Sequence, residues 1–366
     1  CDPMREDGMA IADYLNQLSG ILFLKACDAS GKVTLHKLDD EDSLHLPEEY
    51  RWEAITNSNN NQLETYKKAI DYLKNKDGDL AKRAFDGFNP KFNRESTFRK
   101  TLSLVEDIPG WDNYDENAEI FGDAYEFLLK KYADKAEGAG EYFTPRPLIQ
   151  AMVDIVDPEA DEEIIDPAAG PNGFLIEAYN HLREKTNDFE EVANLPIEKQ
   201  FTSRENRPET YRLGLMNYLL HDINVGSIHA LQGNSLREEK TRDKEYDVVL
   251  ANPPFGSDIS NKYDSRADST IEMNFLMMMM DMLNDDGRAA IIVPEGILFD
   301  GSKEPAREEL LNLYNLDVIL ALPEDTFQPY AGVDANVLFF ERDENGTDEF
   351  WFYDARSDFE NIKESN

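Results

Sequence analysis

DVVLANPPFG, at residues 247–256, joins a continuous apolar run to a turn that contains two consecutive prolines. A run of this kind suits a strand that is buried on both faces, as strands of parallel sheets are. Pro253 and Pro254 cannot donate to a sheet ladder and hold the chain extended. We therefore expect the amide of Asn252 and the ring of Phe255 to be fixed at the exposed end of this strand.

Other continuous apolar runs lie on both sides of this stretch, at 164–165, 289–293, 318–322 and 337–340. They alternate with helical patterns, which predicts parallel strands in a doubly wound α/β sheet. Ligands of such sheets bind at the carboxyl ends of the strands. The residues that directly follow each run are thus the first candidates for a functional site.

The N-terminal third of the chain has a different pattern, in which apolar residues recur at helical spacing. These residues form two stripes, Ile11, Leu15, Leu18 and Leu22, and then Phe121, Tyr125, Leu128 and Tyr132. Both stripes predict helices that pack into a core. A small-residue stretch at 136–140 is typical of a linker. With 366 residues, the chain is expected to form two domains, a helical N-terminal domain at 1–135 and an α/β domain at 136–366.

The charge of the chain is strongly acidic, with 75 acidic against 37 basic side chains and a formal net charge of -38. Such a chain is a poor DNA binder by itself. The charge indicates either a salt-rich cytoplasm, where screening reduces self-repulsion, or a partner that contacts the nucleic acid. Composition leaves both possibilities open.

Cysteine content and hydropathy exclude several other classes of protein. Cys1 and Cys27 form no CxxC pattern and have no histidine cluster beside them, so we expect neither a metal site nor a disulfide framework. No apolar run approaches the roughly 20 residues that span a bilayer, and no signal peptide is evident. We therefore expect a cytoplasmic protein with no membrane partner.

A turn of small residues, Asp166-Pro167-Ala168-Ala169-Gly170-Pro171-Asn172-Gly173, follows the first apolar run. Small residues there let a ligand approach the backbone and a helix N-terminus, although an ordinary tight connection would look the same. The GxGxxG pattern is absent, and the next acid at a strand end, Glu205, lies much further along than the roughly 20 residues of a dinucleotide fold. NAD is therefore disfavoured. No GxxxxGK[ST] phosphate loop occurs either, which excludes a nucleotide-driven motor.

The turn at 252–255 suits a planar ligand that carries an amino group. The Asn252 side chain and main-chain carbonyls of the proline turn can accept hydrogen bonds from an exocyclic amine, and Phe255 offers a stacking face. A rigid loop without catalysis is the alternative.

Together these motifs resemble those of the modification (M) subunits of type I restriction-modification systems, adenine-N6 DNA methyltransferases that use S-adenosylmethionine. The resemblance includes Gly122-Asp123-Ala124-Tyr125-Glu126, Arg204-Glu205-Asn206, Gly233-Asn234-Ser235-Leu236, Pro294-Glu295-Gly296, Pro329-Tyr330-Ala331-Gly332-Val333 and Asn336-Val337-Leu338-Phe339-Phe340. It implies a doubly wound, Rossmann-like class I methyltransferase sheet preceded by an α-helical N-terminal domain.

The resemblance also implies the site residues. The catalytic residues would be Asn252, Pro253, Pro254 and Phe255. The cofactor-binding residues would be Tyr142, Phe143, Thr144 and Pro145 at the methionine end; Asp166, Ala168, Gly170, Asn172, Gly173 and Phe174 in the cofactor loop; Glu205 at the ribose; and Asn234 and Ser235 beside the adenine. The family loop commonly carries Thr and Gly where this chain has Pro171 and Asn172, and Asn can adopt the left-handed conformation of a glycine.

The implied reaction is direct methyl transfer to a flipped adenine in double-stranded DNA, without a covalent enzyme intermediate. The implied partners are a specificity (S) subunit, a second M subunit and the restriction/translocation (R) subunit. Two alternatives remain at this point. One is a methyltransferase acting on RNA or on a protein glutamine, because Asn-Pro-Pro-aromatic loops serve those acceptors as well. The other is a catalytically silent architectural subunit, for which the Pro171-Asn172 variation is the support.

Overall fold

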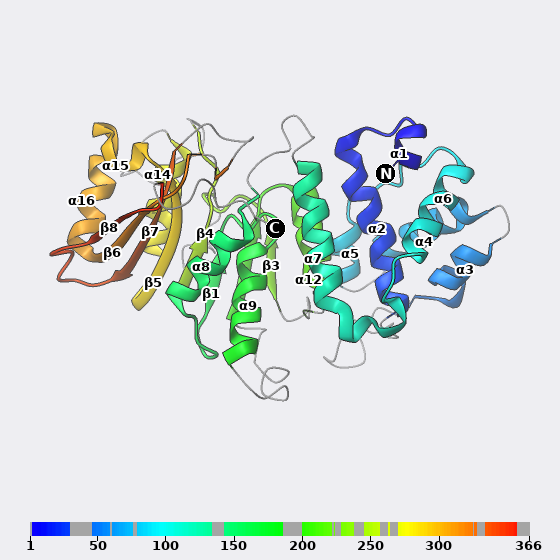
Figure 1. Cartoon of the computed structure of the whole chain (residues 1–366), viewed down its shortest axis with the longest axis horizontal. Helices are drawn as coiled ribbons and strands as arrows, with labels where there is room; N and C mark the ends of the chain where they lie inside the picture. Colours follow the sequence, from blue (N-terminus) through cyan, green and yellow to red (C-terminus); the bar gives the residue numbers. More distant parts are fainter. Residues whose placement is uncertain are drawn as a thin grey trace. The chain divides into compact units, whose positions relative to one another are not determined.

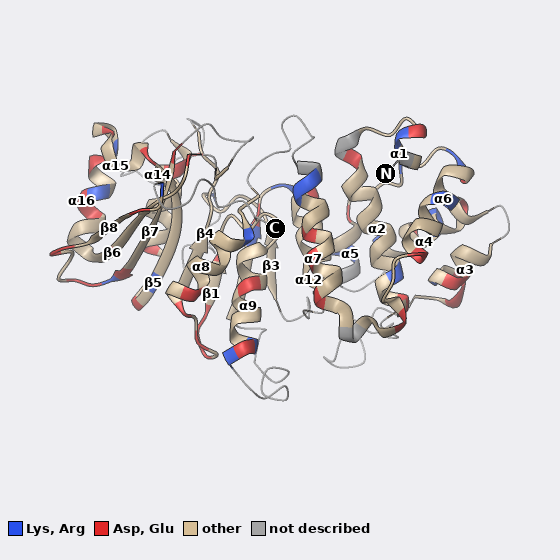
Figure 2. Ribbon diagram, in the orientation of Figure 1, with Lys and Arg blue, Asp and Glu red and all other residues tan. Residues whose placement is uncertain are grey.

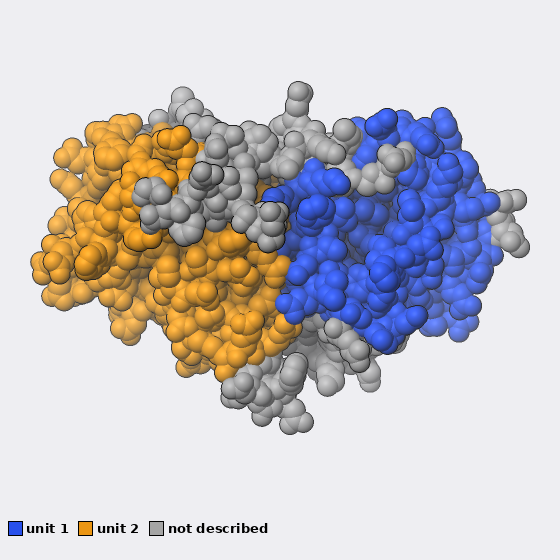
Figure 3. Space-filling model, viewed as in Figure 1, with its two compact units in different colours: residues 1–140, 208–226 blue, residues 141–207, 227–366 orange. Residues whose placement is uncertain are grey.

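The computed structural model describes residues 2–29, 46–58, 61–75, 79–133, 143–185, 200–221, 223, 228–237, 245–256, 263, 270–324, 326–327 and 334–356. Its chain divides into two units, drawn in two colours in Figure 3. Unit 1 comprises residues 1–140 and 208–226, and unit 2 comprises residues 141–207 and 227–366. The expected linker at 136–140 lies outside the described residues, and the domain boundary after residue 135 stays a prediction.

Unit 1 is helical (Figure 1). Its helices are α1 (Asp2–Glu6), α2 (Ile11–Ala29), α3 (Trp52–Asn57), α4 (Gln62–Asn75), α5 (Asp79–Phe85), α6 (Glu95–Glu106), α7 (Tyr114–Ala133) and α12 (Pro208–Leu220), with short 3-10 turns η1 (Glu48–Tyr50) and η2 (Trp111–Asn113). The two helices that the apolar stripes predict are thus present, as α2 and α7.

The buried face of α2 differs from the predicted stripe. Leu22 is buried, but Leu15 and Leu18 are only half-buried, and Tyr14 and Ile21 are buried instead. Helix α2 packs against α6, α7 and α12. Because neighbours surround it on several sides, burial extends around much of the helix and follows no single stripe.

Helix α12 belongs to unit 1 although its sequence lies between two strands of unit 2. It packs against α2, α5 and α7. The Arg212 guanidinium donates to the Asp86 carbonyl at 2.9 Å, and the Tyr114 hydroxyl donates to the Leu219 carbonyl at 3.3 Å. This placement was not predictable from the sequence, because the apolar residues of a helix indicate that it is buried but not which core it joins.

Unit 2 contains a mixed α/β fold. Its strands are β1 (Ile164–Asp166), β2 (Phe201–Glu205), β3 (His229–Gln232), β4 (Tyr246–Ala251), β5 (Leu283–Pro294), β6 (Tyr314–Ala321), β7 (Ala335–Arg342) and β8 (Trp351–Asp354). Its helices are α8 (Arg146–Val156), α9 (Gly173–Lys185), α14 (Ile271–Asp281), α15 (Gly296–Phe299) and α16 (Glu304–Leu313), with the 3-10 turn η4 (Gly301–Lys303).

The strands form one eight-stranded sheet in the order β3-β2-β1-β4-β5-β7-β6-β8. The predicted doubly wound α/β sheet is confirmed. The prediction that the run at 337–340 is a parallel strand is wrong, because β7 runs antiparallel to both β5 and β6. The reason is that a continuous apolar run reports burial on both faces, which a central strand has in either direction.

Helices cover both faces of the sheet. On one face, Val249, Ile291 and Leu338 share a buried cluster with the methionine-rich helix α14 and with α16. The alternate residues, among them Val248 and Ile292, are also buried, and α8 and α9 contact β1, β4 and β5 there. Among the helices that the structure describes, none combines the length and apolar character needed to cross a membrane.

Candidate functional site

Strands β3, β2, β1 and β4 are adjacent and parallel, so their carboxyl ends lie along one edge of the sheet. Most of the predicted site residues follow these four ends. Phe143, Thr144 and Pro145 lead into α8, and Gly173 begins α9. Tyr142 lies outside the described residues.

Asn252 directly follows β4 and is buried, with 6% of its surface exposed. Its Nδ2 donates to Thr144 Oγ1 at 3.0 Å, which joins two predicted motifs that are 108 residues apart. Its Oδ1 is buried and has no hydrogen-bond partner among the described residues. A buried carbonyl oxygen without a partner is costly, so this atom is available to accept a hydrogen bond from a ligand.

The rest of the proline turn is anchored at its far end. Pro253 is buried, and Pro254 and Phe255 are half-buried. The Phe255 ring meets the Phe327 ring edge to face, with centroids 6.5 Å apart. The Gly256 N–H donates to the Glu272 carboxylate of α14 at 3.1 Å. Sequence reasoning missed Glu272, because no local pattern marks a side chain that reaches back to a loop 16 residues earlier.

The turn after β1 is shaped by hydrogen bonds to its own backbone. Asp166 Oδ1 accepts from the Ala168 N–H at 3.0 Å. Gly170 and Asn172 both have left-handed backbones, with φ of 53° and 69°. A Cβ on Gly170 would meet no heavy atom of the described residues within 4 Å, so none of these residues fills the space beside this turn. Asn172 takes the conformation that a glycine would take, and its buried Oδ1 has no hydrogen-bond partner among the described residues.

Glu205 connects this turn to the end of β2. One carboxylate oxygen accepts from the Gly170 N–H at 3.0 Å, and the other accepts from the Arg207 N–H at 2.7 Å. Its main-chain carbonyl accepts from the Gly233 N–H at 2.9 Å. Glu205 therefore ties together the loops that follow β1, β2 and β3.

The remaining predicted residues support these loops. The Ser235 hydroxyl donates to the Pro167 carbonyl at 2.6 Å and is buried. Asn234 Oδ1 accepts from the Leu236 N–H at 3.0 Å. Ala168 packs against the apolar cluster of unit 2, and the Phe174 side chain is buried in the first turn of α9.

The electrostatics of the site are set by two neighbouring acids. Burial raises the pKa of the Asp166 carboxyl to about 8; the hydrogen bond from the Ala168 N–H lowers this pKa, and the negative charge of Glu205 raises it. A positively charged ligand beside these two carboxyl groups would favour their ionised forms.

The raised pKa of Asp166 predicts a pH-dependent stability. The unfolded carboxyl has a pKa of about 3.9, so between about pH 4 and 8 the folded chain holds a proton that the unfolded chain releases. The stability that Asp166 contributes is complete below pH 4 and falls as pH rises toward 8.

Asp166→Asn keeps the acceptor for Ala168 but does not titrate. The melting midpoint of the wild type should therefore drop relative to that of the variant over this range, as differential scanning fluorimetry can measure; midpoints that stay parallel would contradict the prediction.

Known proteins match the chain along nearly its whole length. A family model described as N-6 DNA Methylase matches residues 116–366, and one described as HsdM N-terminal domain matches residues 1–105. The type I restriction enzyme StySPI methylase subunit of Salmonella potsdam is 35% identical over 98% of this chain and 70% of its own length.

Solved structures agree with these matches. A chain from a type I R-M system, in a study of complex assembly and conformational transition, has a TM-score of 0.78 and 30% identity, covering 97% of this chain and 74% of its own. The modification subunit of a type I restriction enzyme from Vibrio vulnificus YJ016 has a TM-score of 0.78 and 29% identity, covering 96% of this chain and 81% of its own. The chain belongs to the methylase subunits of type I restriction enzymes, and it is a DNA methyltransferase that transfers a methyl group from S-adenosylmethionine to N6 of adenine.

Proposed function

We propose that the loop after β4 holds the target adenine and that the loops after β1, β2 and β3 hold S-adenosylmethionine. One observation carries this assignment: the Asn252 amide is fixed by Thr144 through its nitrogen, while its buried oxygen has no hydrogen-bond partner among the described residues. An amide held in this way presents an acceptor, which is what an exocyclic amine requires.

The residues present fit the cofactor. S-adenosylmethionine carries positive charge on its sulfonium and amino groups, and the buried Asp166 lies beside a second acid, Glu205. The space beside Gly170, which no described residue fills, and the acceptor oxygen of Asn172 belong to the same turn. We assign Asp166, Gly170 and Asn172, with Phe143, Thr144 and Pro145, to the methionine end, Glu205 to the ribose hydroxyls, and Asn234 and Ser235 to the adenine side.

In this mechanism the chain positions the acceptor nitrogen and performs no covalent catalysis. Asn252 Oδ1 and the Pro253 carbonyl accept hydrogen bonds from the N6 amino group, which orients the nitrogen lone pair. Pro254 keeps the turn rigid, and Phe255 stacks on the extruded base. When bound, S-adenosylmethionine supplies an electrophilic methyl group on its sulfonium sulfur. The amino nitrogen held by Asn252 and the Pro253 carbonyl would accept this methyl group and release a proton to water.

The left-handed backbone of Asn172 bears on the alternative of a silent architectural subunit. The Pro171-Asn172 variation was its support, but Asn172 has a φ of 69°, as a glycine in that turn would. Asn172 therefore adopts the backbone conformation that favours glycine, which weakens the support for a silent subunit. The match of the HsdM N-terminal domain to residues 1–105 favours DNA over RNA or a protein glutamine as the acceptor.

We further propose that the chain works in the cytoplasm on double-stranded DNA, assembled with a specificity subunit, a second methylase subunit and a restriction/translocation subunit. One of the similar solved chains, that of the type I R-M system, comes from a structural study of complex assembly. Acidic residues, red in Figure 2, lie on helices of both units. The net charge of -38 gives the chain little general attraction to phosphates. Base reading therefore falls to another subunit.

The decisive experiment is transfer of a radiolabelled methyl group with and without a co-expressed specificity subunit. DNA, RNA and protein are offered as acceptors, and methylated DNA is sequenced. The isolated chain should bind cofactor but bind DNA weakly and without sequence preference, and assembly should produce adenine methylation in a defined motif. Modification of a defined motif by the chain alone would reject the partner hypothesis, and transfer to RNA or protein alone would reject the DNA substrate.

A further inference from the structure

A histidine and two carboxylates meet in unit 1, between α7 and the residue that follows α12. Asp123 and Glu126 are one helical turn apart on α7, and His221 directly follows α12. One ligand atom from each of the three residues lies within 4.8 Å of the other two. The His221 Nε2 is 3.6 Å from a Glu126 carboxylate oxygen.

The His221 ring is buried but lacks a hydrogen bond at one nitrogen. Only 2% of its side chain is exposed, and its Nε2 has no hydrogen-bond partner among the described residues. A separation of 3.6 Å from Glu126 is too long for a hydrogen bond. Buried polar nitrogens nearly always have a partner, so an imidazole nitrogen left in this state, next to two carboxylates, points to a ligand.

The surroundings fix the ring and one of the carboxylates. A Cβ on Gly122 would overlap the imidazole ring, so the absence of a side chain at Gly122 makes the room in which the ring lies against α7. The Asn217 amide donates to the Glu126 carboxylate at 3.3 Å, which orients Glu126 as residues behind metal ligands commonly do. Asp123 is exposed, so an ion could enter from solvent on that side.

We propose that Asp123, Glu126 and His221 bind one divalent transition-metal ion, which cross-links α7 to the end of α12. A neutral imidazole and two carboxylates balance a 2+ charge and leave a coordination position for water. The imidazole nitrogen favours Zn²⁺ or Co²⁺ over Mg²⁺ and Ca²⁺, which prefer oxygen ligands. The spacing of cysteine and histidine residues predicted no metal site, because these ligands come from segments about ninety residues apart.

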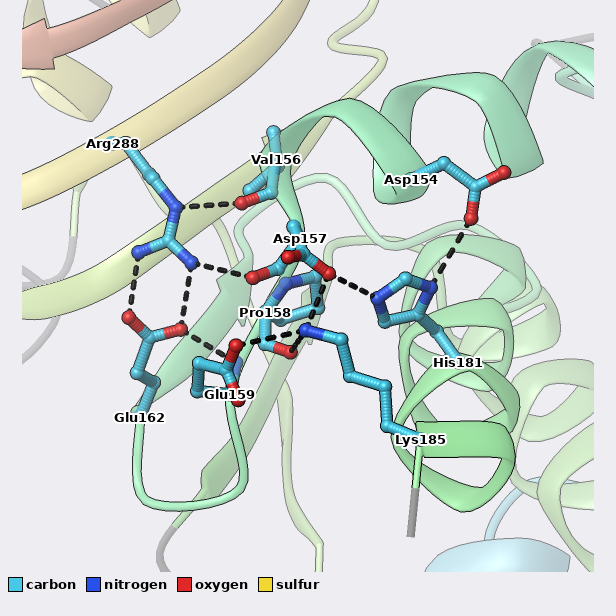
Figure 4. A network of polar contacts seen from close by, with 9 residues as sticks. All are labelled: Asp154, Val156, Asp157, Pro158, Glu159, Glu162, His181, Lys185 and Arg288. Atoms are coloured by element: carbon cyan, nitrogen blue, oxygen red, sulfur yellow. Dashed lines mark hydrogen bonds and ion pairs between the residues drawn. The ribbon is translucent and has the colours of Figure 1, made fainter.

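A second histidine of the chain provides a matched control. Figure 4 shows His181 between two aspartates: its Nδ1 lies 3.1 Å from Asp154 and its Nε2 lies 2.8 Å from Asp157. Both ring nitrogens are therefore hydrogen-bonded, and the two carboxylates contact different nitrogens of the ring. One ion cannot take the imidazole and both carboxylates there, and Asp157 also forms an ion pair with Lys185.

The test uses the full chain, without a histidine tag and after chelator treatment, titrated with Zn²⁺ by calorimetry and with Co²⁺ by visible absorption. The wild type and His181→Asn should each bind one equivalent at this site and gain a higher melting midpoint. Asp123→Asn and Glu126→Gln should weaken Zn²⁺ binding by about tenfold or more, and His221→Asn should abolish it.

Asp123→Asn should fold like the wild type, because it changes one exposed side chain. Circular dichroism checks the fold of each variant. Three results would each overturn the proposal: a wild type that binds no Zn²⁺, an Asp123→Asn variant with wild-type affinity, or Mg²⁺ that binds as tightly as Zn²⁺. The last would indicate an oxygen site without the imidazole.

Discussion

Asn252→Ala should lower the rate of methyl transfer to DNA by about 10²–10³-fold, the range measured when one preorganised polar contact to a reacting group is removed. Binding of S-adenosylmethionine should stay nearly unchanged. The reason is that Asn252 Oδ1 is assigned to the target amine, whereas most residues assigned to the cofactor lie in the loops at the ends of β1, β2 and β3. The variant also loses the hydrogen bond to Thr144, but Thr144 itself remains.

Two measurements separate the two effects. Single-turnover methylation by the assembled complex reports transfer, and calorimetry on the same preparation reports cofactor affinity. Asn284→Ala is the matched control, because Asn284 also has a buried Oδ1 without a hydrogen-bond partner among the described residues, but it lies near the start of β5, at the opposite end of the sheet. If Asn252→Ala transferred methyl groups at the wild-type rate, the assignment of the loop after β4 to catalysis would be wrong.

Glu205→Ala should weaken S-adenosylmethionine binding by about 1–3 kcal/mol, the value of lost hydrogen bonds to a charged group. The carboxylate of Glu205 has two tasks in our proposal. It holds the turn after β1 through the Gly170 N–H, and it accepts from the ribose hydroxyls. The variant loses both, so affinity alone does not isolate the second task.

A cofactor analogue that lacks the ribose 2′-hydroxyl isolates the contribution of the hydrogen bond between Glu205 and the ribose. The wild type should bind the analogue more weakly than S-adenosylmethionine, and Glu205→Ala should no longer distinguish the two ligands. Glu272→Ala is the control, because Glu272 also accepts from a glycine N–H, that of Gly256, but in the loop assigned to the target base. Its cofactor affinity should remain that of the wild type. If Glu205→Ala still preferred S-adenosylmethionine to the analogue as strongly as the wild type does, Glu205 would not be the residue that binds the ribose hydroxyls.

Strands β1, β4 and β7 were predictable because they are largely buried on both faces, and a run of apolar residues indicates such burial. No such run marked β3, which is largely exposed, or β8, which is exposed at all four positions. The direction of β7 was not predictable, since Val337 and Phe339 would be buried equally in a parallel strand. The direction of β7 depends on the path of the chain between β6 and β7, and an apolar run does not indicate that path.

The site was predictable where a motif is local, and unpredictable where a partner comes from far along the chain. The positions of Asn252 and Glu205 follow from the strand ends that precede them. The bond from Asn252 to Thr144 depends on how the segment before α8 approaches β4, and the approach of Glu272 to Gly256 depends on where α14 begins. Helical periodicity likewise could not reveal that α12 packs with α2, α5 and α7.

The placement of α12 has a consequence for recombination between relatives. A crossover near residue 140 would join the helices of one parent to the α12 of the other. The bonds from Arg212 to Asp86 and from Asn217 to Glu126 would then have to form between sequences that never evolved together. Chimaeras of this family should therefore inherit residues 208–226 from the same parent as residues 1–140, so that unit 1 is exchanged as two separate genetic segments.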